Sequence, residues 1–542
     1  MSATPDQSVL VNGPRATHVS TWGPLRQPLF RALWIAAVAS NIGTWMEDVG
    51  EAWLMTSLSS SSLKVALVET AGSLPVVLLA IPSGAFADLL DRRRLLIITQ
   101  AWMLVAAATL SVCTIAGITT PWLLLTLAFL LGLGAAANAP AWEAITPALV
   151  SRKDLPAAVT LGAVAFNVAR AVGPALGGLL VASIGPGLVF LLNAVSFFGV
   201  LITLYRWPGT TKKSTLPPEH VFEAMRAGIR YVRHTPALQA VLVRAAAFII
   251  GASALWALLP LVARHELHLS AAGYGVLLGC FGLGGVTGAA LLTRIKQTLS
   301  INSLVVVATL VFAAVTLIVG YTEKPVVVMA SLFFGGAAWM ALLSTFNVAV
   351  QTATAEWVRA RVLGAYMLAF FGGWALGSAL WGWIADHFGV SATLSIAASS
   401  LLVGLTAAFR FKLICREDLD LTPSLHWPEP KVVASDNPDK SGPVLVTVEY
   451  RIDPENAEAF KSAARRLSEI RQRDGALYWN LFHDTNDPGR YLESFVTDSW
   501  AEHLRQHGRV TRADKEIEDN VWTYHIGASP PQVAHLIAES PE

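Results

Sequence analysis

Long apolar segments separated by short polar stretches occupy most of this chain. Because a helix needs roughly 20 residues to cross a bilayer, apolar segments of this length predict membrane spans. Six helices, a polar segment at 207–237 and six more helices are expected. The predicted spans lie near 30–57, 63–87, 95–117, 121–143, 156–183, 186–206, 238–263, 271–293, 302–320, 325–350, 360–385 and 391–411. Within the polar segment, the stretch from Glu223 to Arg233 predicts an amphipathic basic helix.

The chain changes character after Arg416, where polar residues and prolines indicate a linker. Alternating apolar residues then predict strands at 444–451, 476–484, 490–496 and 521–526, with a helix at 454–473. An order of strand, helix, two strands, helix and strand is that of a ferredoxin-like sandwich. We therefore predict an all-α membrane protein of twelve transmembrane helices with a small C-terminal α+β domain.

This pattern divides the chain into seven expected parts. They are a cytoplasmic tail at 1–28, a six-helix bundle at 29–206, a cytoplasmic linker at 207–237, a second six-helix bundle at 238–412, a linker at 413–440, the ferredoxin-like domain at 441–527 and a tail at 528–542.

Composition agrees with a membrane protein. Of 542 residues, 54% are hydrophobic and only 14% are charged, and the mean hydropathy is +0.52. A net charge of +1 gives no sign of a nucleic-acid partner. Cys113, Cys280 and Cys415 are too scattered for a disulfide or metal motif, so we expect no metal and no cofactor. Residues 1–28 lack the apolar core of a cleaved signal peptide, so the first long helix is expected to direct insertion.

Basic residues indicate the orientation of the helices. With the N-terminus in the cytoplasm, the predicted inner loops hold the clusters 92–94, 152–153 and 226–233, whereas the outer loops hold only Lys64, Arg264 and Lys324. Short basic loops remain on the cytoplasmic side of a membrane. Both termini are therefore expected in the cytoplasm, and the chain in a plasma membrane or a bacterial inner membrane.

The two predicted bundles resemble each other in sequence. Residues 170–178, in the fifth helix, match residues 374–382, in the eleventh, and Arg152 falls opposite Arg359 in the preceding loops. Internal repeats of this kind are typical of transporters. They favour a protein that moves a solute across the membrane along a path between its two halves.

The loop after the second predicted helix carries Gly84, Asp88, Arg92, Arg93 and Arg94. This spacing resembles the loop signature of the major facilitator superfamily, and its departures resemble the branch of enterobactin exporters and macrolide efflux proteins. The resemblance implies a gating loop made of Gly84, Asp88, Arg92 and Arg93, close to Arg361. The alternative is a simple basic anchor on the cytoplasmic side.

Gly173, Pro174, Gly177 and Gly178 in the fifth helix resemble the antiporter signature of facilitators that export their substrate. Proline removes one helical hydrogen bond, so we expect a bend at Pro174. The glycines permit close approach of another helix, and the glycine-rich helix at 271–293 is the expected partner. The alternative is that these glycines serve packing alone.

Ionisable residues inside the predicted spans mark candidate proton sites. Asp48 shares a helix face with Asn41 and Trp45, and we predict that it carries the proton, with Arg170 as its counter-charge. A static ion pair is the alternative reading. Further coupling candidates are Glu47 and Glu69. The predicted substrate cavity is lined by Asn41, Trp45, Trp142, Trp256, Trp339 and Phe346.

The segment 493–507 resembles the antibiotic-biosynthesis monooxygenase-like family of small dimeric domains. The polar candidates there are Trp479, Asn480, His483, His503 and His507. We favour an interaction or dimerisation module over an active oxygenase, because two histidines four residues apart on a helix are often a solvated face.

These features predict a secondary exporter of a small amphipathic molecule, driven by proton antiport, with the substrate, protons and the lipid bilayer as partners. Export and substrate class are implied by the resemblance. No phosphate-binding loop motif occurs, so ATP drive is not indicated. An importing facilitator and a membrane-tethered oxygenase-like enzyme are the alternatives.

Overall fold

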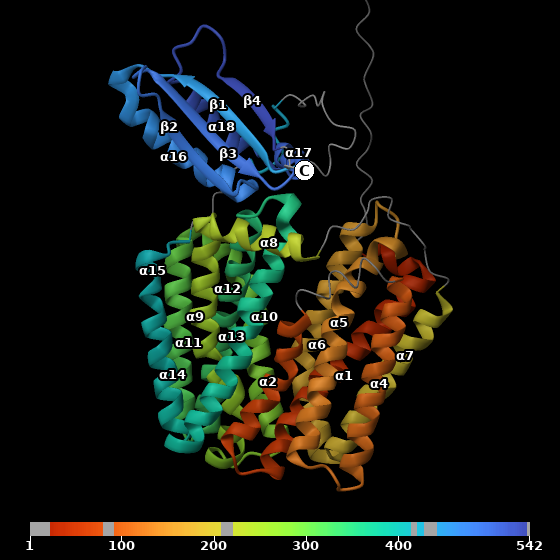
Figure 1. The fold of residues 1–542 in the computed structure, drawn as a ribbon. Helices are drawn as coiled ribbons and strands as arrows, with labels where there is room; N and C mark the ends of the chain where they lie inside the picture. Colours follow the sequence, from red (N-terminus) through yellow and green to blue (C-terminus); the bar gives the residue numbers. More distant parts are fainter. Residues whose placement is uncertain (1–21, 80–90, 208–220, 414–419, 428–441, 539–542) are drawn as a thin grey trace, which may run out of the picture.

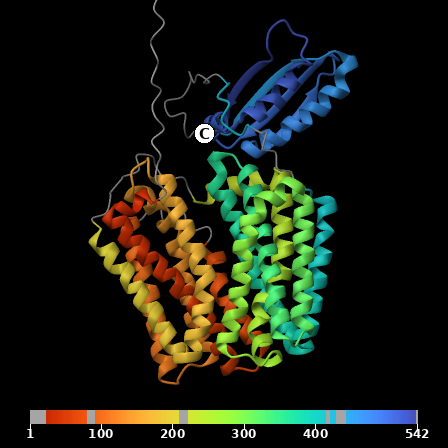
Figure 2. The same ribbon diagram turned by 180° about the vertical axis from the view of Figure 1, so that it is seen from behind.

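A computed structural model describes residues 22–79, 91–207, 221–413, 420–427 and 442–538. Two bundles of long helices stand side by side, and a small α/β domain covers one end of the second bundle (Figures 1 and 2). Several helices begin at proline, among them those that start at Pro28, Pro121 and Pro325. The first turn of a helix does not use its N–H groups internally, so proline begins a helix without loss.

The helices follow the predicted spans closely. In the N-terminal half they are α1 (Pro28–Leu58), α2 (Ser62–Leu79), α4 (Arg92–Ile115), α5 (Pro121–Leu149), α6 (Leu155–Ile184) and α7 (Pro186–Arg206). The linker helix is α8 (Val221–Arg233). In the C-terminal half they are α9 (Pro236–Leu261), the π-helical turn η2 (Val262–Glu266), α10 (Ala271–Thr298), α11 (Ile301–Tyr321), α12 (Pro325–Thr352), the short η3 (Glu356–Val358), α13 (Arg359–Phe388), α14 (Val390–Leu405) and α15 (Ala407–Arg410).

Eleven helices among the described residues are long and apolar enough to cross a membrane. Helix α1 is not one of them, although it has 31 residues. It carries Glu47, Asp48 and Glu51, and such polar side chains lower the mean hydropathy of a segment. The prediction of twelve spans therefore holds only if α1 crosses the membrane as well.

The two halves pack together through α2 against α13 and α6 against α10. Their ribbons converge at the end away from the small domain and separate toward it (Figures 1 and 2). Close packing occurs at Gly382 of α13, where an added Cβ would lie 2.5 Å from the Cβ of Ala66 and 3.2 Å from the carbonyl oxygen of Ser62 in α2.

The small C-terminal domain is an antiparallel four-stranded sheet in the order β2-β3-β1-β4, with helices on one face. Its elements are β1 (Val444–Arg451), α16 (Ala457–Asp474), β2 (Tyr478–His483), β3 (Arg490–Thr497), α17 (Trp500–Arg509), α18 (Arg512–Trp522) and β4 (Gln532–Ile537). We refer to this unit, residues 442–538, as the tail domain. Its buried residues form clusters of their own, apart from the large cluster of the helical bundles.

The prediction of a last strand at 521–526 is wrong. Helix α18 extends through Trp522, and the edge strand is β4, which pairs with β1 from Val444 opposite Ile537 to Glu449 opposite Gln532. A capping box of Thr511 and Asp514 starts α18, and this local signal outweighs the apolar pattern near its end. The tail domain consequently extends beyond the predicted boundary at residue 527.

Candidate functional site

Four carboxylates lie on the first two helices of the N-terminal half. Glu47 and Glu51 of α1 are buried, Glu69 of α2 is half-buried, and Asp48 is exposed. Glu47 accepts a hydrogen bond from Asn193 Nδ2 of α7, whereas its second oxygen is buried without a partner among the described residues. Asp48, Glu51 and Glu69 are close enough to one another to interact electrostatically.

Glu69 connects this acidic group to the other half of the molecule. Its Oε2 atom accepts a hydrogen bond from Trp374 Nε1 of α13, with 3.1 Å between the two atoms. One residue later, the Thr70 hydroxyl donates to the carbonyl oxygen of Ala375 at 3.0 Å. A change at Glu69 would therefore act directly on the contact between the halves.

Trp374 belongs to a group of rings in the C-terminal half. Its ring centroid lies 5.6 Å from that of Trp256 and 5.5 Å from that of Trp339. The indole N–H of Trp256 is buried and lacks a hydrogen-bond acceptor among the described residues. Buried donors without acceptors are rare, so this N–H is a candidate contact for a polar substrate group.

The structure gathers only some of the predicted cavity residues. Trp339 and Phe346 contact Phe248, and Trp256 contacts Trp339. Trp339 is 5% exposed and Phe346 1%, so these two belong to the core in this conformation. Trp142 packs into a separate cluster within the N-terminal half.

Asn41 and Trp45 are half-buried on α1, on the side of the N-terminal half. Trp45 contacts Phe166 of α6 edge-on, with 6.3 Å between the ring centroids. These two residues thus lie apart from the ring group of the C-terminal half.

Arg170 does not pair with Asp48 in this structure. Its Nη2 atom approaches Met340 Sδ of α12 at 3.6 Å, and it forms no ion pair within the part of the chain that the structure describes. The guanidinium group thus crosses from α6 to the C-terminal half. Its role as a counter-charge remains a prediction that would require another conformation.

The glycines of α6 contact two different helices. Gly178 faces α10, as predicted, with an added Cβ only 2.5 Å from the carbonyl oxygen of Ala271 and 2.6 Å from the Cα of Gly275. The same partner was expected for Gly173 and Gly177, but these two pack against Trp45 and Met46 of α1. The correction follows from geometry, because α6 lies between α1 and α10 and presents a different face to each.

Polar contacts join the two halves at the end away from the tail domain. Asp386 of α13 accepts hydrogen bonds from the Ser61 hydroxyl, at 2.7 Å, and from the N–H of Ser62 at the start of α2. A carboxylate is favoured there by the N–H groups and the dipole of the helix. Sequence reasoning missed this contact because a charge at a helix end resembles an ordinary solvated residue.

Arg264 makes a second contact at the same end. It donates to Thr56 at 3.0 Å and to Ser57, and it stacks over the ring of Trp53 at 5.3 Å. Trp53 in turn stacks on Tyr274 of α10 with 6.0 Å between the ring centroids. The end of α1 is thereby tied to the C-terminal half.

The predicted gating loop is only partly within the described residues, since Gly84 and Asp88 lie outside them. Asp91 caps α4 by accepting from the N–H of Arg94. Arg93 donates to the carbonyl oxygens of Leu204 and Tyr205 at 3.0 and 2.7 Å, so it contacts α7 of its own half and not the start of α13.

Arg361, the other residue of the predicted gate, lies in the first turn of α13. Its Cβ is 2.8 Å from the position of an added Cβ on Gly228 of α8. Arg361 therefore packs against the linker helix.

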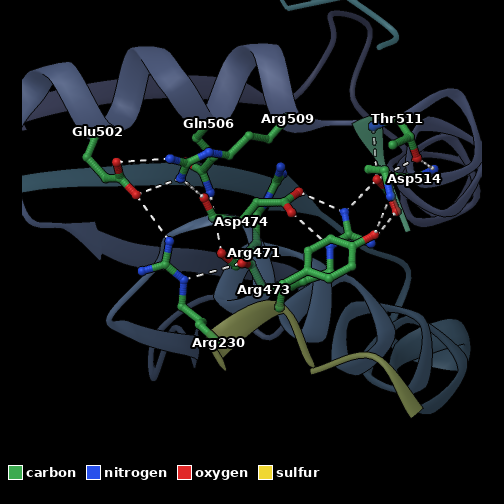
Figure 3. Close-up of polar contacts among 11 residues, drawn as sticks. Arg230, Arg471, Arg473, Asp474, Glu502, Gln506, Arg509, Thr511 and Asp514 are labelled. Carbon is green, nitrogen blue, oxygen red and sulfur yellow. Dashed lines mark hydrogen bonds and ion pairs between the residues drawn. The ribbon is translucent and has the colours of Figure 1, made fainter. Parts of the chain in front are cut away.

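The tail domain docks onto α8 and η3 through charged and aromatic side chains, and Figure 3 shows the polar contacts around Arg230 of α8. Arg230 of α8 binds Glu502 of α17 at 3.1 Å and donates to the carbonyl oxygen of Arg473 at 3.3 Å. Arg509 lies over the ring of Trp357 at 4.6 Å. Burial alone would raise the pKa of Glu502, but the hydrogen bonds and charges of Arg509 and Arg230 outweigh burial and hold that pKa below its usual value.

Inside the tail domain, Arg471 is buried between two carboxylates, with Glu493 at 3.3 Å and Glu518 at 2.9 Å. Trp479 donates to Glu493 at 2.9 Å. His483 stacks on Tyr491, and Asn480 is exposed. His503 and His507 contact each other and a third histidine, which was not foreseen because its strand was misplaced.

Comparisons with known proteins agree with this architecture. The chain matches the family model described as transmembrane secretion effector over residues 19–542. It is 26% identical to the multidrug efflux pump Tap of Mycolicibacterium fortuitum, over 74% of this chain and 98% of that protein. It is 24% identical to the staphyloferrin A transporter of Staphylococcus aureus, over 68% and 92% of the two chains. It is 26% identical to the enterobactin exporter EntS of Citrobacter koseri, over 69% and 90%.

Solved structures with a similar fold are transporters. A bacterial homologue of the human lysosomal transporter Spinster, in an inward-facing conformation, gives a TM-score of 0.56 at 14% identity over 71% of this chain and 95% of its own. A mutant of the nucleoside transporter NupG gives a TM-score of 0.57 at 13% identity over 71% of this chain and 100% of its own. At this identity the likeness concerns the fold. Taken with the family match, it shows that the chain is a multi-pass membrane transporter that belongs to the transmembrane secretion effector family of the major facilitator superfamily.

Proposed function

We propose that this chain is a secondary active transporter that exports a small amphipathic molecule in exchange for protons. The observation that carries the proposal is the acidic group of α1 and α2, which contacts the ring group of the C-terminal half through the hydrogen bond from Trp374 to Glu69. Carboxylates placed inside a membrane are costly and are commonly retained for ion or substrate pathways.

A proton bound by this acidic group removes negative charge at the junction of the halves. A charged Glu69 is a strong acceptor for the Trp374 N–H, whereas the protonated form is a weaker one. Protonation therefore loosens the link between α2 and α13. Proton binding and movement of the halves become dependent on each other, which is the requirement for coupled transport.

The aromatic group supplies the proposed substrate surface. Trp256 and Trp374 are half-buried rings at the junction, and the free N–H of Trp256 offers one polar contact. Such a surface suits a molecule with an apolar or aromatic part and a few polar groups. The names of the relatives, which include a multidrug efflux pump and an enterobactin exporter, support this substrate class and the outward direction.

The orientation that we propose places both termini, the tail domain and α8 in the cytoplasm. The basic residues Arg92, Arg152 and Lys153 lie in inner loops under this assignment. The contacts of Asp386 and Arg264 then close the outer side, and this conformation is open toward the cytoplasm.

Proteoliposomes with an imposed pH gradient test the proposal. Efflux of a fluorescent amphipathic cation driven by the gradient should be lost in Glu69→Gln and in Asp48→Asn, while both proteins still bind the compound. Glu323→Gln, an exposed carboxylate in the loop before α12, is the matched control and should retain efflux. Gradient-driven efflux in a well-folded Glu69→Gln, Asp48→Asn double variant would refute proton coupling through this group.

For the tail domain we propose a ferredoxin-like interaction module that joins two copies of the chain. The sheet face opposite the helices carries the exposed side chains of Tyr478, Phe482 and Leu536. Light scattering of the detergent-solubilised chain tests this: Phe482→Glu should shift dimer to monomer. A monomeric wild-type chain would exclude the proposal.

A further inference from the structure

Three histidines of the tail domain lie together between α17 and the edge strand β4. His503 and His507 are four residues apart on α17, and His535 lies on the helix-covered side of β4, opposite Val446 of β1. One nitrogen atom from each imidazole lies within 4.8 Å of the others. This arrangement joins two elements that are distant in sequence.

The spacing of one pair of these nitrogens suits a tetrahedral metal ion, and the nitrogen of His535 lies within 4.8 Å of both. The Nε2 atoms of His503 and His507 are 3.3 Å apart. Two nitrogen ligands, each at about 2.05 Å from Zn²⁺ with a tetrahedral angle between them, are also ~3.3 Å apart. Histidines four residues apart on one helix face are a recurrent zinc-binding arrangement. His503 is 1% exposed, whereas the other two are half-buried, so the fourth position of such an ion would face solvent.

Gln506 lies beside His503 on α17, and the two side chains interact by hydrogen bonding. His503 Nδ1 and Gln506 Oε1 are both buried and have no other hydrogen-bond partner within the described part of the chain. A metal ion on Nε2 requires the proton of His503 to reside on Nδ1, and the neighbouring Gln506 oxygen is an acceptor for that N–H. Gln506 can therefore hold the imidazole of His503 in the tautomer that a metal ligand requires.

The nearby charges have opposite effects on a cation at this cluster. The positive charge of Arg471 opposes a cation at both His503 and His507, whereas the carboxylate of Glu518 favours one at His507. Arg471 lies over the ring of Trp427, which itself contacts His507 edge-on. Two carboxylates, Glu493 and Glu518, bind Arg471, so this group as a whole carries net negative charge. His426 hydrogen-bonds to Glu518.

We propose that His503, His507 and His535 form a binding site for a divalent transition-metal ion that prefers imidazole ligands, such as Zn²⁺. The site has a structural consequence as well. Helix α17 also carries Glu502 and Arg509, which dock the tail domain onto α8 and η3. A bound ion ties α17 to β4 and thereby stiffens the helix that makes the docking contacts.

Metal binding can be measured directly on the full-length chain in detergent, purified without a polyhistidine tag. Equilibrium dialysis against Zn²⁺ should show a single ion per chain. His507→Ala and His535→Ala should each weaken binding at least tenfold, because each removes a ligand from a half-buried position. His483→Ala, an exposed histidine of the same domain that hydrogen-bonds to Pro488, is the matched control and should bind as the wild type does.

A second measurement covers the case in which a variant fails to fold. Co²⁺ added to the wild-type chain should give the intense visible absorption of a tetrahedral nitrogen-ligated site, and Zn²⁺ should displace it. A wild-type chain without that absorption overturns the proposal. So does an unchanged Zn²⁺ affinity in a folded His507→Ala, His535→Ala double variant.

Discussion

At the scale of single residues, the ion pair of Arg471 with Glu518 makes the stability of the tail domain depend on pH. Burial favours the neutral form of Glu518, but the Arg471 charge and the hydrogen bonds from His426, Arg471 and Trp427 outweigh it and lower the pKa of Glu518 to about 2. A carboxyl with a depressed pKa stabilises the fold above its unfolded pKa. That contribution should decline as pH falls from about 4.5 toward 2.

This dependence yields a prediction for pepsin, which is active in the same pH range. In the full-length chain, cleavage of the tail domain should accelerate as pH falls from about 4.5 toward 2. Glu518→Gln should be cleaved faster already at pH 4.5, because removing one partner from a buried ion pair costs about 3–5 kcal/mol. Glu516→Gln, two residues away on the same helix, should behave as the wild type. Equal cleavage of Glu518→Gln and wild type at pH 4.5 would show that the carboxylate contributes little.

At the scale of elements, the contact between α6 and α10 depends on the absence of a side chain at Gly178. Alanine there would place its Cβ 2.5 Å from the backbone oxygen of Ala271, so the helices must separate. We expect Gly178→Ala to destabilise the chain by about 1–3 kcal/mol and to reduce transport. Gly162→Ala on the same helix meets no atom within 4 Å and is the control, with equal or slightly higher stability. Thermal unfolding in detergent measures the difference, and identical transitions for both variants would contradict it.

The start of α2 provides a test of the outer closure. Asp386→Ala removes the carboxylate that binds Ser61 and Ser62, so it should shift the population toward a state open on the outer side. In a background without Cys113, Cys280 and Cys415, a cysteine at Thr70 reports this state. Impermeant maleimide added outside should label it faster in Asp386→Ala and at the wild-type rate in the neighbouring His387→Ala. Equal labelling in both variants would mean that Asp386 does not hold the outer side closed.

Element by element, the sequence predicted the long helices well, because runs of apolar residues that begin at a proline leave few alternatives. It failed at β4, where most side chains are exposed and the alternation is weak, and the error also concealed His535. The acidic residues of α1 and α2 were identified from their cost inside a membrane. The contacts of Glu69 with Trp374 and of Asp386 with α2 were not, since they join residues more than 300 positions apart and depend on how the two halves meet.

At the scale of the whole molecule, the separate cores of the bundles and the tail domain predict that the tail can be removed. A stop after Arg416 should leave an inserted, monodisperse protein, because Tyr231 and the other core residues of the C-terminal half retain most of their neighbours. Substrate efflux should change modestly. Gel filtration and efflux assays measure both, and Arg230→Gln, which weakens docking without removing the domain, is the comparison. Aggregation of the truncated chain would show that the tail is part of the membrane fold.

The docked tail domain offers a way to observe movement of the C-terminal half. Arg230 and Trp357, which contact the tail domain, belong to segments adjoining the C-terminal half. A rocking movement of that half would therefore move the tail domain with it as one rigid body. A small rotation near the membrane centre becomes a larger displacement at a distance from the pivot. A fluorophore on the exposed Asn486, in the loop between β2 and β3, and another on the N-terminal half would therefore report the transport cycle as a change in the distance between them, readable on single molecules in real time.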